Sequence, residues 1–298
     1  MTRRGLLLFA AMCVIWGIPY LLIRVAVGEL SPATLVFGRT GIGALILMPV
    51  VLARGGLRGI GARWLPLLAF AAFEIGIPWL LLSSAEQKIS SSLAGLLISA
   101  VPLVGTLIAP LFGNRDWIGS TGVIGLLVGI AGVGAIVGFD LRGSAPFPMV
   151  EMGLVAISYA VGPAILSRYL TGVPPVSVIG ISLTLCALVY APVAFLQWPH
   201  QLPSMPVLGS VAILGVVCTA IAFLLFFALI AEIGPVRATV ITYVNPAVAA
   251  VLGVAILRET FSFGMAVGFV LVIAGSVLAT RRPRRAVVPK RLGESTSV

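Results

Sequence analysis

Charged side chains are scarce in this chain of 298 residues, since they make up 9% of it while 60% of the residues are hydrophobic. No soluble core can enclose that much apolar surface, so the composition excludes a soluble globular fold. The sequence also holds one histidine and three cysteines, without metal-ligand spacing. We therefore expect no metal, no cofactor and no catalytic residue, and we expect Cys13, Cys186 and Cys218 to pack as small apolar side chains.

Long apolar runs fill almost the whole chain. A run of about 18 or more apolar residues can cross a bilayer as a helix, and backbone groups in lipid must be hydrogen-bonded within their own segment. The runs do not alternate as barrel strands do. We predict an all-α polytopic membrane protein with ten transmembrane helices, at 6–27, 33–53, 64–83, 90–112, 118–138, 149–170, 176–196, 207–230, 236–257 and 262–280.

Basic residues are distributed unevenly about the predicted helices. If the N-terminus is cytoplasmic, most of the 19 basic residues fall on the cytoplasmic side, and Lys88, Arg142 and Arg258 fall on the outer side. Cytoplasmic loops carry the positive excess, so we expect both termini in the cytoplasm and the protein in the cytoplasmic (inner) membrane. The charges are too dispersed for a nucleic-acid partner. Residues 282–298 are expected to form a basic, disordered cytoplasmic tail.

The chain repeats itself at a shift of 143–144 residues. The most informative matches are Pro19 with Pro163, Arg24 with Arg168 and Pro102 with Pro246. We therefore predict one five-helix repeat in 1–141 and a second in 142–281. Because five is odd, the second half begins on the opposite side of the membrane, which gives two inverted repeats, a recurring architecture of secondary transporters.

Short motifs recur in a fixed order along these runs. They are Trp16-Gly17, Phe37-Gly38-Arg39 and Pro102 in the first half, and Asn245-Pro246, Leu257-Arg258-Glu259 and Ala274-Gly275 in the second. Together they resemble the EamA family of the drug/metabolite transporter superfamily, although Asp116 stands at the first-half position of Glu259 with one residue inserted. The resemblance implies ten transmembrane helices and export of small metabolites or amino acids without ATP. The chain also lacks a GxxxxGK[ST] loop.

Two charged residues inside the spans are candidates for substrate contact. A carboxylate at the bilayer centre is costly, so Glu74 should face the interior, as a proton site, as a counter-charge for a substrate amine, or as a structural partner of Arg24 or Arg39. Arg39 lies about two turns into the second span. It can grip a carboxylate or phosphate through two parallel hydrogen bonds, or it can be a snorkelling or ion-paired structural residue.

Aromatic and amide side chains deep in the spans are candidate cavity residues, with an interfacial position as the alternative for Trp and Tyr. They are Trp16, Tyr20, Trp79, Tyr159, Tyr243 and Asn245. Prolines in the spans are candidate hinges or plain kinks. They are Pro19, Pro78, Pro102, Pro163 and Pro246. Glu86, Asp140, Glu151 and Glu232 lie at span ends and are expected to be solvated, whereas Glu259 is expected to fix a helix end or a loop.

The sequence thus predicts a secondary transporter that exports small metabolites, with amino acids or related polar compounds as the first choice. We expect alternating access and partners limited to a small-molecule substrate, the lipid bilayer and, through Glu74, protons. The alternatives are an exporter of lipophilic cationic drugs, an intramembrane enzyme and a non-transporting assembly subunit. Gly125, Gly129 and Gly132 line one side of the fifth helix, which permits close packing within the bundle or at a dimer seam. The chain is therefore expected to be a monomer or a homodimer.

Overall fold

The computed structural model describes residues 2–57, 60–112, 120–140 and 146–280, and all regular structure within these residues is helical. The predicted basic tail and Asp116 lie outside them. Nine described helices are long and apolar enough to cross a membrane, and the tenth predicted span is an apolar helix of 17 residues, Ile241–Leu257. The predicted all-helical membrane fold is confirmed.

The first half contains α1 (Arg3–Ile15), α2 (Pro19–Ala26), α3 (Pro32–Ala53), η1 (Gly61–Arg63), α4 (Trp64–Phe70), η2 (Ala71–Gly76), α5 (Ile77–Ala85), α6 (Ser91–Ile98), α7 (Val101–Ile108), η3 (Ala109–Phe112) and α8 (Ser120–Asp140). The second half contains α9 (Phe147–Tyr169), α10 (Pro175–Leu196), α11 (Met205–Gly215), η4 (Val216–Ile221), α12 (Ala222–Ile233), α13 (Pro235–Ala238), α14 (Ile241–Leu257) and α15 (Phe263–Thr280). Short loops join successive spans, so neighbouring spans run in opposite directions.

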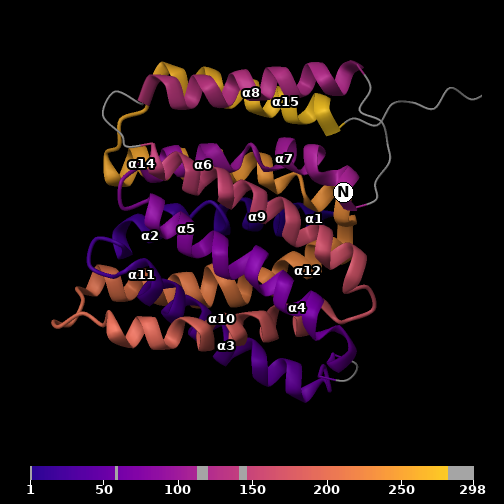
Figure 1. Cartoon of the computed structure of the whole chain (residues 1–298), viewed down its shortest axis with the longest axis vertical. Coiled ribbons are helices and arrows are strands. Elements are labelled where there is room, and N and C mark those ends of the chain that lie inside the picture. Colours follow the sequence, from indigo (N-terminus) through magenta and orange to yellow (C-terminus); the bar gives the residue numbers. More distant parts are fainter. Residues whose placement is uncertain (1, 58–59, 113–119, 141–145, 281–298) are drawn as a thin grey trace, which may run out of the picture.

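The two halves pack against each other with equivalent helices paired. The second spans pair as α3 with α10, the fourth as α6 with α14, and the fifth as α8 with α15. The third span of each half packs on the first span of the other, as α5 on α9 and α12 on α1. This pairing is what a pseudo-twofold axis between two five-helix repeats produces. Figure 1 shows α8 and α15 at one edge of the bundle and α3 and α10 at the opposite edge.

The first and last described residues lie at the same end of the bundle (Figure 1). We call this the terminal end. The opposite end carries the connections 27–31, 86–90 and 258–262, and we call it the far end.

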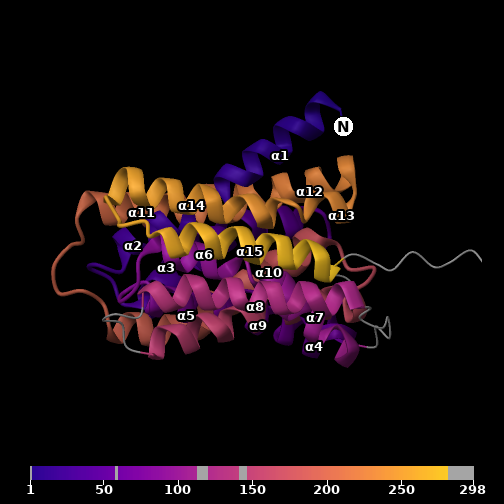
Figure 2. The same cartoon turned by 90° about the horizontal axis from the view of Figure 1, so that it is seen from above.

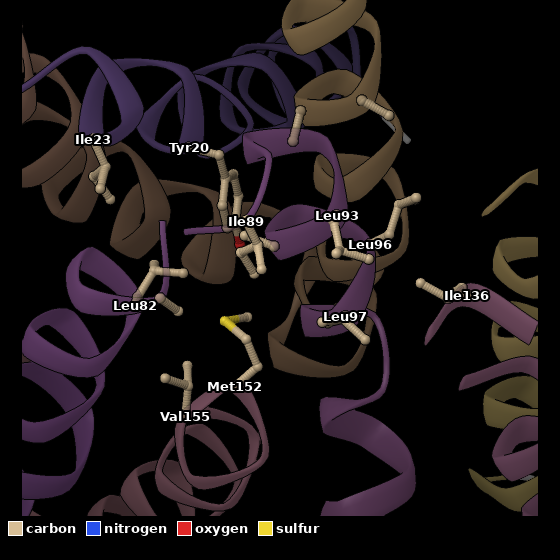
Figure 3. Packing of buried hydrophobic residues seen from close by; sticks show 14 of the residues in the cluster. Tyr20, Ile23, Leu82, Ile89, Leu93, Leu96, Leu97, Ile136, Met152 and Val155 are labelled. Carbon is tan, nitrogen blue, oxygen red and sulfur yellow. The ribbon is translucent and has the colours of Figure 1, made fainter. Parts of the chain in front are cut away.

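Apolar side chains occupy both the interior and the outer faces of the bundle. In the interior, Tyr20, Leu82, Leu93 and Met152 come from four helices and point toward one another, as Figure 3 shows. On the outer faces large apolar side chains remain exposed, including Leu45, Leu127, Leu188, Val251 and Val270. Such a surface suits hydrocarbon, while the shared interior holds the two halves together.

The fifth spans approach each other closely because glycines face each other across their contact. A Cβ on Gly132 would lie 2.7 Å from the Val272 nitrogen, and one on Gly268 would lie 2.6 Å from the Gly132 carbonyl oxygen. Only a residue without a side chain fits at such distances. Within the predicted glycine stripe on α8, Gly125 and Gly132 are therefore packed against α15, and Gly129 lies beside Leu103 of α7.

The third span of each half contains a π-helical turn at a repeat-related position, η2 in the first half and η4 in the second. A π-turn leaves backbone carbonyls without their usual helical partners, and such turns are frequent at functional sites. Here, side chains supply the missing donors. The Tyr190 hydroxyl donates to the Gly76 carbonyl at 3.1 Å, and the Thr219 hydroxyl donates to the Leu214 carbonyl at 2.8 Å.

The five candidate hinge prolines divide into two groups. Pro19 and Pro102 lie in the first turn of α2 and α7, where a span breaks into two helical segments. Pro78 lies in the first turn of α5, directly after the π-helical turn η2, in a span that stays helical throughout. Pro163 and Pro246 lie inside the uninterrupted helices α9 and α14. Figure 2 shows α1, which precedes the break at Pro19, inclined to the rest of the bundle.

Candidate functional site

Arg39 links the two halves inside the bundle. Its side chain is 7% exposed, its Nε donates to the Thr219 hydroxyl at 2.9 Å, and its guanidinium carbon lies 3.5 Å from the centre of the Trp79 ring. It forms no ion pair with a described carboxylate, and its two terminal nitrogens have no hydrogen-bond partner among the described residues. Arg39 is thus held in place by one bond and one ring, with donor capacity left over for a ligand.

Arg39, its contacts Thr219 and Trp79, and the two tyrosines described below are called the Arg39 group. This group lies between the far end and the middle of the bundle. Arg39 is seven residues after Pro32, the first residue of α3, and therefore about 10 Å from the far end. Thr219 lies midway along the span Met205–Ile233, and Tyr159 lies near the middle of α9. A substrate at this depth would be enclosed by helices of both halves.

Two tyrosines complete this group. Tyr20 is 7% exposed and Tyr159 is half-buried, packed between two clusters of the apolar core. Both hydroxyls lie close enough to Arg39 to interact with it electrostatically, and Tyr159 also interacts with the Trp79 side chain. The structure therefore brings together Tyr20, Arg39, Trp79 and Tyr159, four residues that the sequence singled out separately.

Glu74 lies on η2 and faces α9, the helix that carries Tyr159. Its carboxylate covers Gly162 of α9, where any Cβ would collide with Oε2, and this oxygen is buried without a hydrogen-bond partner in the described structure. Glu74 interacts electrostatically with Tyr159. It forms no ion pair with Arg24 or Arg39 among the described residues, so a structural partnership with either arginine is not formed.

Two other candidate residues, Trp16 and Asn245, make their described ring contacts and hydrogen bonds outside the Arg39 group. Trp16 packs against Phe223 and Phe226 of α12, with ring centres 5.8 and 4.7 Å away. The Asn245 amide nitrogen, oriented toward two carbonyls, donates to Cys13 at 3.1 Å and to Ile241 at 3.0 Å. These contacts fix α1 against α12 and α14.

Tyr243 is half-buried on α14. Within the described residues it makes no hydrogen bond or ring contact with the Arg39 group.

Sequence reasoning missed Thr219, whose fully buried hydroxyl accepts the bond from Arg39. A threonine in an apolar span gives no strong signal, because its hydroxyl commonly bonds its own backbone. The usable signal is the repeat: the counterpart of Glu74 is Cys218, and Thr219 follows it. The repeat thus places Thr219 beside the position that corresponds to Glu74.

The prediction of solvated carboxylates is wrong for Glu86 and Glu151, which are 0% and 3% exposed. The physical reason for Glu86 is the short connection between α5 and α6, which keeps the side chain inside the bundle. Ile89 in the same connection is also buried. Glu232 differs, because it accepts a hydrogen bond from the Thr2 hydroxyl at the terminal end.

Glu259 ties the halves together at the far end. Its carboxylate accepts four hydrogen bonds from the first turn of α6: from the backbone nitrogen and hydroxyl of Ser91 at 2.8 and 2.9 Å, and from those of Ser92 at 2.9 and 2.6 Å. Burial alone would raise the pKa of Glu259, but these four bonds hold it below its ordinary value. We call this contact the far-end clamp, and it confirms the expected helix-end role.

Other contacts between the halves lie at both ends. At the far end, the Glu29 carboxylate accepts from the Ser204 nitrogen at 2.7 Å and from its hydroxyl at 2.6 Å, at the start of α11. At the terminal end, Arg63 donates to the Thr171 carbonyl and Arg168 to the Phe112 carbonyl. Polar contacts between the two halves are thus described at both ends of the bundle.

Comparisons with known proteins agree with this architecture. The model of the EamA-like transporter family matches the chain twice, at residues 3–138 and 150–281. A solved structure superposes with a TM-score of 0.66 at 23% identity, covering 94% of this chain and 97% of the other, which supports the fold.

Two relatives from different organisms align with this chain over most of their length. The protein named "Uncharacterized inner membrane transporter YedA" of Escherichia coli (strain K12) is 28% identical over 85% of this chain and 82% of its own. The protein named "Uncharacterized transporter YvbV" of Bacillus subtilis (strain 168) is 23% identical over 95% of this chain and 93% of its own. With a family match over both halves and a bundle of apolar helices, the chain belongs to the EamA-like transporter family and is a multi-pass membrane transporter.

Proposed function

We propose that this transporter is a secondary carrier that exports small polar metabolites, amino acids first, from the cytoplasm across the inner membrane. The family membership supports transport of a small molecule, and the name of the Escherichia coli relative, an inner membrane transporter, supports a location in the inner membrane. The excess of arginine at the terminal end favours a cytoplasmic location for both termini. In this orientation the far end faces the outside.

The observation that carries the proposed cargo is a pair of opposite charges that do not neutralise each other. Arg39 and Glu74 both interact electrostatically with Tyr159, yet each lacks an ion-pair partner among the described residues. An amino acid carries one carboxylate and one ammonium group. Arg39 would hold the carboxylate through its free nitrogens, and Glu74 would hold the ammonium through its unpartnered oxygen.

Alternating access would move this site between the two sides. The halves meet at the Arg39–Thr219 hydrogen bond, and polar contacts tie them at both ends. Opening one end while the other stays tied would expose the Arg39 group to one side at a time. We propose Pro19 and Pro102 as hinges because a span breaks at each, and Pro78 as a hinge because it follows the π-helical turn η2. Glu74 would act as a proton carrier when no substrate amine is bound.

A second cargo class, lipophilic cations, is favoured by a specific feature. The Glu74 carboxyl group interacts electrostatically with Tyr159, which in turn contacts Trp79, and aromatic faces attract cations. Against this class, a cation alone would leave Arg39 beside an additional positive charge. A zwitterion satisfies both site charges, so we place amino acids first.

Transport by the purified chain in reconstituted vesicles tests this proposal. A panel of labelled amino acids, a lipophilic cation and a phosphorylated sugar is offered with and without an imposed pH gradient. We expect saturable uptake of amino acids. Uptake of the cation alone would replace the proposal with the second cargo class, and uptake of none would favour a non-transporting role.

Two variants test the site within the same assay. Arg39→Gln removes the charge from the Arg39 group, whereas Arg54→Gln removes an exposed charge from the end of the same helix. We expect the first to lower saturable uptake by about 10- to 100-fold and the second to leave it unchanged. Glu74→Gln should lose the response to the pH gradient; a full response in that variant would eliminate Glu74 as the proton carrier.

A further inference from the structure

Glu86 is a buried carboxyl group that the transport site does not use. It follows the last residue of α5, just beyond the membrane-spanning segment Gly61–Ala85, and its side chain has no exposed surface. Neither carboxyl oxygen has a hydrogen-bond partner in the described part of the chain. Arg24 of α2 donates to the Glu86 backbone carbonyl instead. An ionised carboxylate is costly to bury without partners, so this environment favours the neutral acid.

Charged and titratable groups from several elements face Glu86. Arg24 and Tyr20 on α2, Arg39 on α3, Tyr159 on α9, and Glu259 in the connection after α14 interact with it electrostatically. Glu151 at the start of α9 is a further buried carboxyl group, and Lys88 lies in the same connection as Glu86. Burial raises the pKa of Glu86 well above its ordinary value, Glu259 raises it further, and the two arginines oppose this.

Glu86 is mechanically joined to the far-end clamp. The connection 86–90 runs from Glu86 to Ser90, which caps α6 through a bond from the Leu93 nitrogen to its hydroxyl. The clamp holds the next two residues, Ser91 and Ser92. A movement of α6 away from Glu259 must therefore also move the connection that buries Glu86.

We propose that Glu86 is a proton-binding site that couples protonation to closure of the far end. With the clamp closed, as in this structure, Glu86 holds its proton as a carboxylic acid. When the clamp opens and water reaches the side chain, the O–H bond breaks, the proton passes to water on the far side, and the carboxylate remains solvated. Closure requires the reverse transfer, so the far end would return to the closed state with a proton bound.

The pH dependence follows from two carboxyl groups with opposite requirements. The clamp needs ionised Glu259, which is present above its lowered pKa, and burial needs protonated Glu86, which is present below its raised pKa. The closed far end is therefore favoured between these two pKa values and opens as the pH rises through that of Glu86. For the exporter proposed above, on which this step rests, protons would enter from the outside through Glu86.

Infrared difference spectroscopy and hydrogen exchange of the full chain in lipid nanodiscs test the site, with pH as the probe and no substrate present. In the native chain we expect an infrared band of protonated carboxyl groups at neutral pH. Glu86→Gln should remove part of this band. In the matched control, Glu151→Gln, the Glu86 part of the band should remain and titrate at the same pH as in the native chain. Amide exchange of residues 91–98, corrected for its intrinsic pH dependence, should rise as the pH rises and lose that response in Glu86→Gln.

Two results would overturn the proposal. A band unchanged in Glu86→Gln would show that Glu86 is not protonated, and a pH response of residues 91–98 that survives in this variant would show that its protonation is not coupled to the clamp. If Glu86→Gln does not fold, Glu259→Gln decides: with the negative charge gone, the Glu86 band should titrate at lower pH, and an unshifted band would reject the site. Because no substrate is used, failure here is separate from failure of the proposed transport.

Discussion

The two five-helix halves pair symmetrically, yet they differ in continuity and in charge. In the first half two spans break at Pro19 and Pro102, whereas the corresponding Pro163 and Pro246 lie inside the helices α9 and α14. The fourth span of the second half breaks ahead of Pro246, between α13 and α14. Arg39 and Glu74 both come from the first half. The second half contributes the neutral groups Thr219 and Tyr159. The paired helices therefore form a symmetric frame, whereas Arg39, Glu74 and the breaks beside Pro19 and Pro102 lie in the first half.

The largest effect should come from removing the charge of Arg39, compared with a substitution at the repeat-related position of the second half. Arg39→Gln should lower transport by about 10- to 100-fold, because hydrogen bonds to a charged group contribute about 1.5–3 kcal/mol. The counterpart 143 residues later is Ser182, which is fully buried with an unpartnered hydroxyl. Ser182→Ala should therefore leave uptake unchanged in the vesicle assay. Equal losses in both variants would mean that the site is symmetric.

The next largest effect should appear between α8 and α15, where the backbones of the two halves approach each other closely. Gly132→Val would force the two backbones apart and should lower the free energy of unfolding by about 1–3 kcal/mol, as overpacking does. Gly134 on the same helix has open space beside it, so Gly134→Val should have little effect. Denaturant titration in mixed micelles measures both variants, and a similar loss in each would argue against close packing of these helices.

A smaller effect should separate the two far-end contacts. Glu259→Gln weakens the clamp on α6 and should increase amide exchange in residues 91–98, while Glu29→Gln should act on residues 205–215 of α11. Because the folded-state pKa of Glu259 lies below its ordinary value of 4.5, its contribution is present above pH 4.5 and is lost as the pH falls through the folded-state value. Acidification of the native chain should therefore reproduce Glu259→Gln. If amide exchange of residues 91–98 changes neither in Glu259→Gln nor on acidification, the far-end clamp does not stabilise α6.

The smallest effect should distinguish the prolines. Pro19→Ala restores a backbone donor where α1 and α2 meet, so it should straighten this span and slow transport without a large change in stability. Pro163→Ala changes a helix that is already continuous and should leave the transport rate close to that of the native chain. A slower rate in Pro163→Ala alone would contradict the assignment of a hinge to Pro19.

The sequence was sufficient to predict the helices because hydropathy and length determine which segments can cross a bilayer. The span predicted at 33–53, for example, is Pro32–Ala53 in the structure. It also identified Arg39 and Glu74, because charge in an apolar run is conspicuous. It did not reveal Thr219 or the burial of Glu86. Both depend on how helices distant in sequence pack, and a carboxylate at the end of a span looks solvated until its surroundings are known.

The charge pair can be tested directly by offering three matched compounds to the reconstituted chain: an amino acid, its analogue without the amino group, and the amine without the carboxylate. Binding between Arg39 and Glu74 predicts fast exchange of the amino acid alone, with Arg39→Gln shifting preference toward the amine and Glu74→Gln toward the acid. Exchange of the amine or the acid as fast as that of the amino acid in the native chain would contradict it.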